Sequence, residues 1–218
     1  MRHRFRVVPR LVGVLLALAA VRPALAADAP AADAPAAARA AIADAGVAYR
    51  FGDDERALAL VTPARDDADP DVRHAALFLA GRVHQRRGSL AAAQDALRTA
   101  AAAPSPVRHV ARLALAEVLA AAGDGKGATA LLAALPRGLV DGEDRFRVQF
   151  AVGAAQTAAG DHAAAERTYR KLLGLWHPRL QKDTALWRLA ELREQAGDAQ
   201  GAAALFRRLV LEYPGSAH

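Results

Sequence analysis

Residues 183–216 read DTALWRLAELREQAGDAQGAAALFRRLVLEYPGS and contain the pattern that decides the fold. Two stretches rich in alanine and leucine flank Gly197-Asp198, and Pro214 follows the second stretch. A glycine suits the left-handed residue that ends one helix, an aspartate suits the N-cap of the next, and a proline cannot continue a helix. The stretch therefore predicts a helix, a tight turn and a second helix.

The same arrangement recurs along the chain at near-constant spacing. A glycine followed by a small polar residue stands between two apolar stretches five times, 35 to 37 residues apart. These pairs are Gly52-Asp53, Gly88-Ser89, Gly123-Asp124, Gly160-Asp161 and Gly197-Asp198. One such pair means little, but five in register predict helical hairpins that stack into a solenoid.

Three further columns keep this register and predict where the helices touch. Seven residues before each turn glycine stands a small residue: Ala45, Gly81, Ala116, Gly153 and Ala190. Five residues after it stands an alanine: Ala57, Ala93, Ala128, Ala165 and Ala202. Nine residues after it stands a larger apolar or aromatic residue: Val61, Leu97, Leu132, Tyr169 and Phe206. Small residues let two helices approach closely, and we expect the larger ones to fill the space alongside. Four prolines are expected to close units: Pro70, Pro104, Pro178 and Pro214.

This combination resembles the tetratricopeptide repeat, a helical hairpin of about 34 residues. The resemblance covers about Arg39 to Pro214. It is best in residues 183–216 and in the unit before, and the third unit has a short second helix that ends near Pro136. The resemblance implies an all-α fold, a right-handed solenoid of about five tetratricopeptide-like hairpins that occupies residues 39–218.

The beginning of the chain has the features of a secretory signal peptide. Met1–Arg10 carries four arginines and no acid, Leu11–Ala20 is uninterrupted and apolar, and Ala24–Ala26 offers a cleavage site. A membrane anchor would need about 20 apolar residues, but Arg22 and Pro23 interrupt the run. We therefore predict that residues 1–26 are removed near Ala26, that no transmembrane segment remains, and that the protein is periplasmic or secreted.

Residues 27–38 read ADAPAADAPAAA and are predicted to be a flexible spacer. Residues 1–26 contain five of the 29 basic residues and no acid, so the remainder holds 24 basic and 23 acidic residues. A nucleic-acid binder should present a basic face in its mature domain, and this balance does not require one. We expect no nucleic-acid partner.

No motif in the sequence indicates catalysis. The chain has no cysteine, which excludes thiolate chemistry and thiolate metal sites. No two histidines of the mature chain form the i, i+4 pair of a helical metal site; they are His74, His84, His109, His162, His177 and His218. Four acidic residues, Asp66, Asp67, Asp69 and Asp71, lack calcium-loop spacing and are predicted to start a helix. We expect no enzyme activity, no cofactor and no metal.

If the geometry of the family holds, the first helix of each hairpin lines a concave surface that binds a partner. The predicted groove residues are Phe78, Arg82, Gln85, Glu117, Arg147, Phe150, Trp187, Glu191 and Glu194, and the same reasoning places Tyr49 and Leu113 beside them. Phe78, Phe150 and Trp187 share one register, and Arg82, Glu117 and Glu191 share another. Two interpretations stay open. The rings anchor a peptide that the charges select, or the rings pack on neighbouring helices and the charges are solvated.

The ending Glu-Tyr-Pro-Gly-Ser resembles tetratricopeptide domains of bacterial periplasmic envelope-assembly proteins. The sequence therefore predicts a non-catalytic periplasmic scaffold that binds a peptide or protein, with cell-wall machinery among the candidate partners. The alternative is the helical domain of a peptidoglycan lytic transglycosylase whose catalytic domain is missing from this chain. The last hairpin, with Leu205, Phe206, Leu209 and Val210, lacks a capping helix, so a homo-oligomer through it, a continuing chain and a tolerated flank all stay open.

Overall fold

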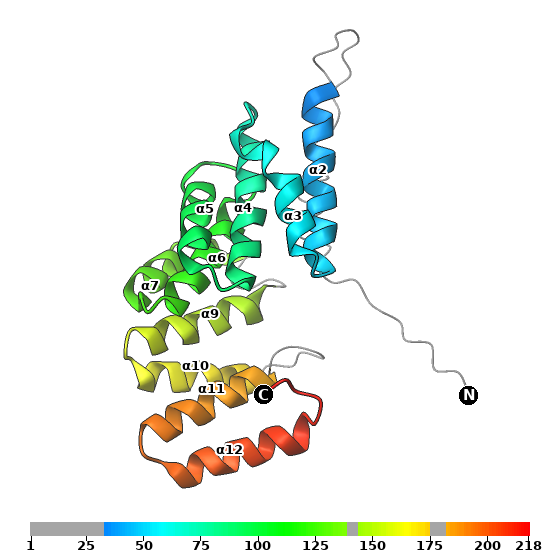
Figure 1. Ribbon diagram of the computed structural model, residues 1–218. Helices are drawn as coiled ribbons and strands as arrows, with labels where there is room; N and C mark the ends of the chain where they lie inside the picture. The colour runs from blue at the N-terminus through cyan, green and yellow to red at the C-terminus, as the bar shows by residue number, and fades with distance from the viewer. Residues whose placement is uncertain (1–32, 139–143, 175–181) are drawn as a thin grey trace, which may run out of the picture. The chain divides into compact units, whose positions relative to one another are not determined.

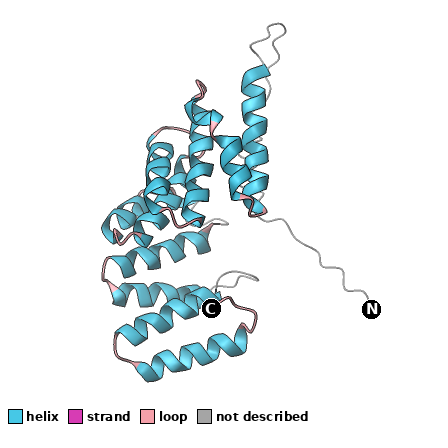
Figure 2. Ribbon diagram, in the orientation of Figure 1, coloured by secondary structure: helices cyan, strands magenta, loops and turns pink. Residues whose placement is uncertain are grey.

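The computed structural model describes residues 33–138, 144–174 and 182–218, and the regular secondary structure of these ranges is helical (Figures 1 and 2). The helices follow one another as antiparallel pairs joined by short turns. They are α2 (Asp33–Arg50), α3 (Asp54–Val61), α4 (Pro70–Arg86), α5 (Leu90–Ala102), α6 (Arg108–Ala121), α7 (Gly125–Ala133), α9 (Arg145–Ala158), α10 (His162–Gly174), α11 (Lys182–Gln195) and α12 (Ala199–Glu212). A short 3-10 helix, η1 (Pro63–Asp66), follows α3. The predicted all-α fold of helical hairpins is confirmed.

The chain divides into two compact units at Arg108 and His109. The first unit contains the hairpins α2–α3 and α4–α5. The second contains α6–α7, α9–α10 and α11–α12. Inside each unit the second helix of one hairpin packs against the first helix of the next: α3 on α4, α7 on α9, and α10 on α11.

The turn of every hairpin has the backbone conformation that the glycine column predicts. All five turn glycines have a positive φ, between 74° and 87°. Four of the residues that follow cap the next helix through their carboxylates, which accept the N–H of Arg56, Gly127, Ala164 and Gly201. Ser89 also stands at an N-cap, but its side chain makes no such bond. The predicted turn chemistry is therefore confirmed at four of five caps.

The predicted contact between the small and the large columns is also present. A Cβ atom added at Gly81 would lie 2.5 Å from Cγ of Leu97, and one added at Gly153 would lie 2.7 Å from Cε1 of Tyr169. The alanines five residues after the turn are all buried. Phe206 is the exception in the large column, because it is only half-buried.

The structure corrects two details at the helix ends. Helix α2 begins at Asp33, so residues 33–38 are helical and not spacer. Pro35 lies in the first turn, where a backbone N–H has no partner inside the helix, so a proline is tolerated there. Pro70 is the first residue of α4 and does not close the preceding unit. By contrast, Pro104, Pro136 and Pro214 follow α5, α7 and α12 as predicted.

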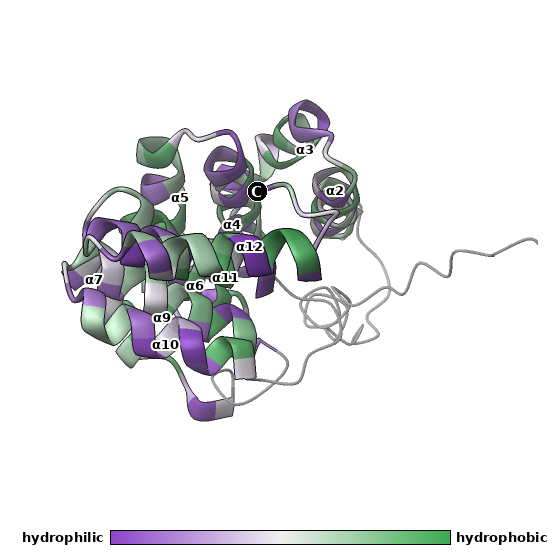
Figure 3. Ribbon diagram, turned by 90° about the horizontal axis from the view of Figure 1, so that it is seen from below, coloured by the Kyte–Doolittle hydropathy of each residue, from purple (hydrophilic) through white to green (hydrophobic). Residues whose placement is uncertain are grey.

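Several predictions lie outside the described residues: the signal peptide 1–26, residues 27–32 of the spacer, Pro178 and His177. Of the helices in the described ranges, none combines the length and apolar character that crossing a membrane requires. In the ranges that the structure describes, four large hydrophobic residues are exposed, two at the end of α2 and two in the last turns of α12. They are Val47, Phe51, Val210 and Leu211. Figure 3 shows a green, hydrophobic stretch near the end of α12.

Candidate functional site

All nine predicted groove residues lie on the first helices of their hairpins. Helix α4 carries Phe78, Arg82 and Gln85, α6 carries Glu117, α9 carries Arg147 and Phe150, and α11 carries Trp187, Glu191 and Glu194. The three residues of α4 belong to the first unit and the other six to the second. The structure therefore brings six of them together in one unit.

Two of the three aromatic side chains serve the interior of their units. Phe78 is only 7% exposed and lies on the buried face of α4. Leu113, in the same register on α6, is fully buried. Phe150 is half-buried and meets the ring of Tyr169 edge-on, with 5.6 Å between centroids and 62° between planes. For Phe78 and Phe150 the packing interpretation fits the structure.

Trp187 contacts two other rings and is half-buried. The edge contact with Phe206 of α12 has a centroid distance of 5.1 Å and an angle of 63°. The imidazole of His218 stacks on the indole, with a centroid distance of 5.3 Å and an interplanar angle of 21°. Trp187 therefore lies at the boundary between interior and surface.

Glu117 and Arg147 form a two-pronged ion pair between neighbouring first helices. Nε of Arg147 donates to Oε1 of Glu117 at 2.6 Å, and Nη2 donates to Oε2 at 3.1 Å. Such a pair fixes both side chains in one orientation. The side chain of Arg147 is 28% exposed and that of Glu117 is 20% exposed, so both also reach the surface of the second unit.

The other charged candidates make contacts along their own helices. Arg82 donates to the side-chain oxygen of Gln85 at 2.7 Å, and Arg188 pairs with Glu191 at 2.9 Å. Glu194 is exposed. In each of the four later hairpins, the residue six positions before the turn glycine is half-buried. These residues are Arg82, Glu117, Ala154 and Glu191. First helices therefore present a repeated, partly exposed position, although only some hairpins place a charge there.

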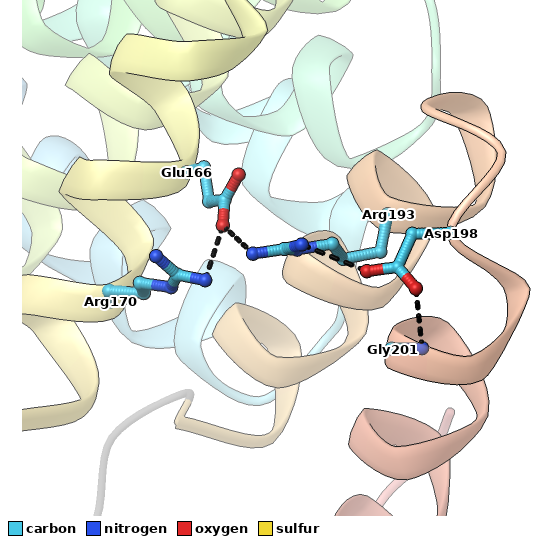
Figure 4. A network of polar contacts seen from close by, with 5 residues as sticks. All are labelled: Glu166, Arg170, Arg193, Asp198 and Gly201. Atoms are coloured by element: carbon cyan, nitrogen blue, oxygen red, sulfur yellow. Dashed lines mark hydrogen bonds and ion pairs between the residues drawn. The ribbon is translucent and has the colours of Figure 1, made fainter.

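Sequence reasoning missed an arginine that ties the last two hairpins together (Figure 4). Arg193 of α11 pairs with Glu166 of α10, and its Nη1 lies 2.8 Å from Oδ2 of Asp198, the N-cap of α12. Glu166 also pairs with Arg170 at 2.6 Å. Hydrogen bonds from the backbone N–H of Gly201 and from Arg193 lower the pKa of the Asp198 carboxyl below its ordinary value.

A second arginine plays the same part in the first unit. Arg86, in the last turn of α4, pairs with Asp54 of α3 and donates to the carbonyl of Tyr49 at 2.6 Å. Its guanidinium also lies 4.1 Å from the centre of the Tyr49 ring. Arg86 stands two residues before its turn glycine and Arg193 stands four before, so the two arginines form no column that a repeat search could find.

The acidic residues before α4 start the helix, as the sequence predicts. Oδ1 of Asp69, the N-cap, accepts the N–H of Asp71 at 2.9 Å, and Asp67 accepts the N–H of Asp69 at 2.8 Å. Burial raises the pKa of Asp69, but hydrogen bonds from Arg39 and from the N–H of Asp71 outweigh this and lower it overall. In the described ranges no group of three or more His, Cys, Asp and Glu side chains is arranged to hold a metal ion.

The comparisons with known proteins agree with the observed repeats. Residues 184–216 match the tetratricopeptide repeat family. No curated protein matches the chain. Three similar solved structures show the fold alone, because their sequence identities are low.

The first, MamA AMB-1, is 18% identical with a TM-score of 0.56, and the match covers 83% of this chain and 93% of that chain. The second, residues 41 to the end of MamA from Desulfovibrio magneticus RS-1, is 16% identical with a TM-score of 0.63 and coverages of 83% and 97%. The third, YrrB, is described as a TPR protein with an unusual peptide-binding site. It is 18% identical with a TM-score of 0.55 and coverages of 80% and 86%.

Proposed function

Because the chain is a tetratricopeptide-repeat protein, we propose that it is a non-catalytic scaffold that binds a peptide or protein partner. The proposed surface is formed by the first helices of the second unit, α6, α9 and α11. One observation carries the proposal: the pair of Glu117 and Arg147 is held in one orientation and still reaches the surface.

A fixed charged pair favours binding for an entropic reason. Long side chains lose rotamer freedom when a ligand orders them, and this loss weakens association. The two hydrogen bonds between Arg147 and Glu117 have already removed that freedom in the free protein. A peptide that carries one charge of each sign therefore meets both charges at defined positions, which supports selectivity for the order of its charges.

Export belongs to the same proposal. The basic start, the apolar run and the cleavage site of residues 1–26 support passage into the periplasm. We place the partner there, in cell-envelope assembly. Fractionation of cells that express the full chain should recover a product that begins after Ala26 in the periplasmic fraction. Recovery of the uncleaved chain in the cytoplasm would contradict this placement.

The test of the binding surface uses a charge swap. The variant E117R/R147E keeps an ion pair between α6 and α9 but exchanges the positions of its two charges. We expect its thermal midpoint to stay close to that of the parent protein, while capture of the partner from an envelope extract by residues 27–218 is lost. Arg207→Ala, at an exposed position on α12, is the control that should retain capture.

Each result of this capture has a clear meaning. A specific protein that is lost only with the charge swap supports the scaffold. Equal capture by the parent and the swapped variant contradicts the proposed surface. Recovery of peptidoglycan or wall enzymes that ignores the swap would favour a helical domain of a wall-cleaving enzyme instead.

A further inference from the structure

Residues 213–218 leave the end of α12 and return to the first turns of α11, where the chain's C mark lies in Figure 1. The hydroxyl of Ser216 donates to Oδ2 of Asp183 at 2.8 Å. Two residues later the imidazole of His218 stacks on Trp187, and its Nε2 lies 3.2 Å from Oγ1 of Thr184. Three side chains of α11 thus contact two side chains of the returning segment.

The groups of α11 that contact the segment lie close together on the first turns of the helix. Burial raises the pKa of Asp183, but the hydroxyl of Ser216 and the N–H of Thr184 lower it more, so the carboxyl is an ionised acceptor at neutral pH. The indole of Trp187 also contacts the ring of Phe206 edge-on. An acceptor, a hydroxyl and an aromatic face therefore lie within one helical turn.

The segment itself has little else to hold it. It contains no regular secondary structure, and its own hydrogen bonds are the N–H of Ser216 to the carbonyl of Tyr213 at 2.9 Å and the N–H of His218 to the Ser216 hydroxyl at 3.3 Å. Pro214, Gly215, Ala217 and His218 are exposed. A segment with so few buried contacts opens more easily than the helices beside it.

We infer that Asp183, Thr184 and Trp187 form a peptide subsite, and that Ser216 and His218 are its intramolecular occupant. The subsite takes a flexible segment with a hydroxyl side chain followed two residues later by an imidazole or an aromatic ring. A partner peptide of this kind binds by displacing residues 216–218. The inference rests on the proposed function, because it places a subsite on α11 of the same unit.

The first experiment asks whether the segment covers Trp187 in solution. The sequence contains two tryptophans, so Trp176→Phe leaves Trp187 as the single reporter. In that background His218→Ala should shift the indole emission and increase its quenching by acrylamide. Ser216→Ala should give a smaller shift in the same direction, and Ala217→Ser, between the two contacts, should give none. An emission that His218→Ala leaves unchanged would overturn the intramolecular occupancy.

The second experiment supplies the occupant as a separate molecule. A peptide with the sequence YPGSAH, that of residues 213–218, is added to S216A/H218A in the same background, up to concentrations on the order of millimolar, which match those of a short tether. We expect saturable binding, several-fold weaker in the protein that keeps Ser216 and His218. The peptide YPGAAA should not bind.

The two possible failures have different meanings. If the peptide does not bind S216A/H218A while the helical signal of the protein is intact, the subsite does not take the proposed class of peptide. Equal binding to both proteins would contradict the displacement of residues 216–218 by the peptide. Neither result touches the pair of Glu117 and Arg147, whose charge swap tests the proposed function separately.

Discussion

The fourth and fifth hairpins use the same columns of residues and reach different degrees of burial. Phe150 meets Tyr169 edge-on at 62°, and Trp187 meets Phe206 edge-on at 63°, so the inner contact is repeated almost unchanged. Tyr169 is nevertheless 1% exposed, whereas Phe206 is half-buried. Helix α11 packs on α10 and closes the core around Tyr169. The repeat pattern thus determines which rings contact each other, and packing of a further helix on the hairpin determines how deeply a ring is buried.

The largest expected difference between the two hairpins comes from removing these rings. Tyr169→Ala should destabilise the protein by about 3–5 kcal/mol, because it leaves a cavity beneath α11. Phe206→Ala should lower stability by less than half as much, because part of that ring is already in water. Urea unfolding followed by circular dichroism measures both. Equal losses would show that Phe206 is as enclosed in solution as Tyr169.

Overpacking the alanine column should give the next largest effect. Ala165 and Ala202 are 0% and 4% exposed and stand five residues after their turn glycines. Ala202→Leu should cost about 1–3 kcal/mol, and Ala165→Leu at least as much, because α10 is covered by α11. The thermal midpoints of the two variants provide the measurement. An unchanged midpoint for Ala202→Leu would contradict the repeat register.

Much of the fold was predictable because, at certain positions, the backbone conformation or a close helix contact suits only a few residue types. A turn with φ near 80° favours glycine, and Gly153 lies too close to Tyr169 for a side chain. Both kinds of position can therefore be recognised in the sequence by their glycine. The sequence prediction assigned residues 33–38 to a spacer that contains Pro35. It missed the start of α2 because the first turn of a helix tolerates a proline.

The candidate site was less predictable, because its contacts join residues far apart in the chain. The sequence placed Glu117 and Arg147 on first helices but gave no sign that they pair across 30 residues. It also gave no sign that His218 reaches Trp187, since no column or spacing links them. Side-chain partners of this kind follow from three-dimensional packing.

The N-caps of the two hairpins should differ by a smaller, pH-dependent amount. Asp161 accepts the N–H of Ala164, whereas Asp198 accepts the N–H of Gly201 and also pairs with Arg193. Asparagine remains a good N-cap, so Asp161→Asn should be nearly neutral, and Asp198→Asn should lower the thermal midpoint at neutral pH.

The acid dependence of that loss follows from the lowered pKa of Asp198. A carboxyl whose pKa is lower in the folded protein stabilises the fold above its unfolded pKa of about 3.9, and this contribution disappears as the pH falls through the folded value. The midpoints of Asp198→Asn and its parent should therefore converge below about pH 4. A difference that stays constant down to pH 2 would show that the charge is not the cause.

The smallest effect on stability is expected at the outer face of the fifth hairpin. Leu173 of α10 is half-buried against the core shared with α11, and Val210, in the same register of α12, is 66% exposed. Val210→Ser should change stability by less than about 0.5 kcal/mol, because the side chain is already in water, whereas Leu173→Ser should be clearly destabilising. Val210→Ser also tests the homo-oligomer that the sequence left open as one of three alternatives. An association through this face would be weakened by Val210→Ser in sedimentation, at an unchanged thermal midpoint. Sedimentation of parent and variant as the same species would remove Val210 from any such contact, and α12 would then be a surface that the fold tolerates.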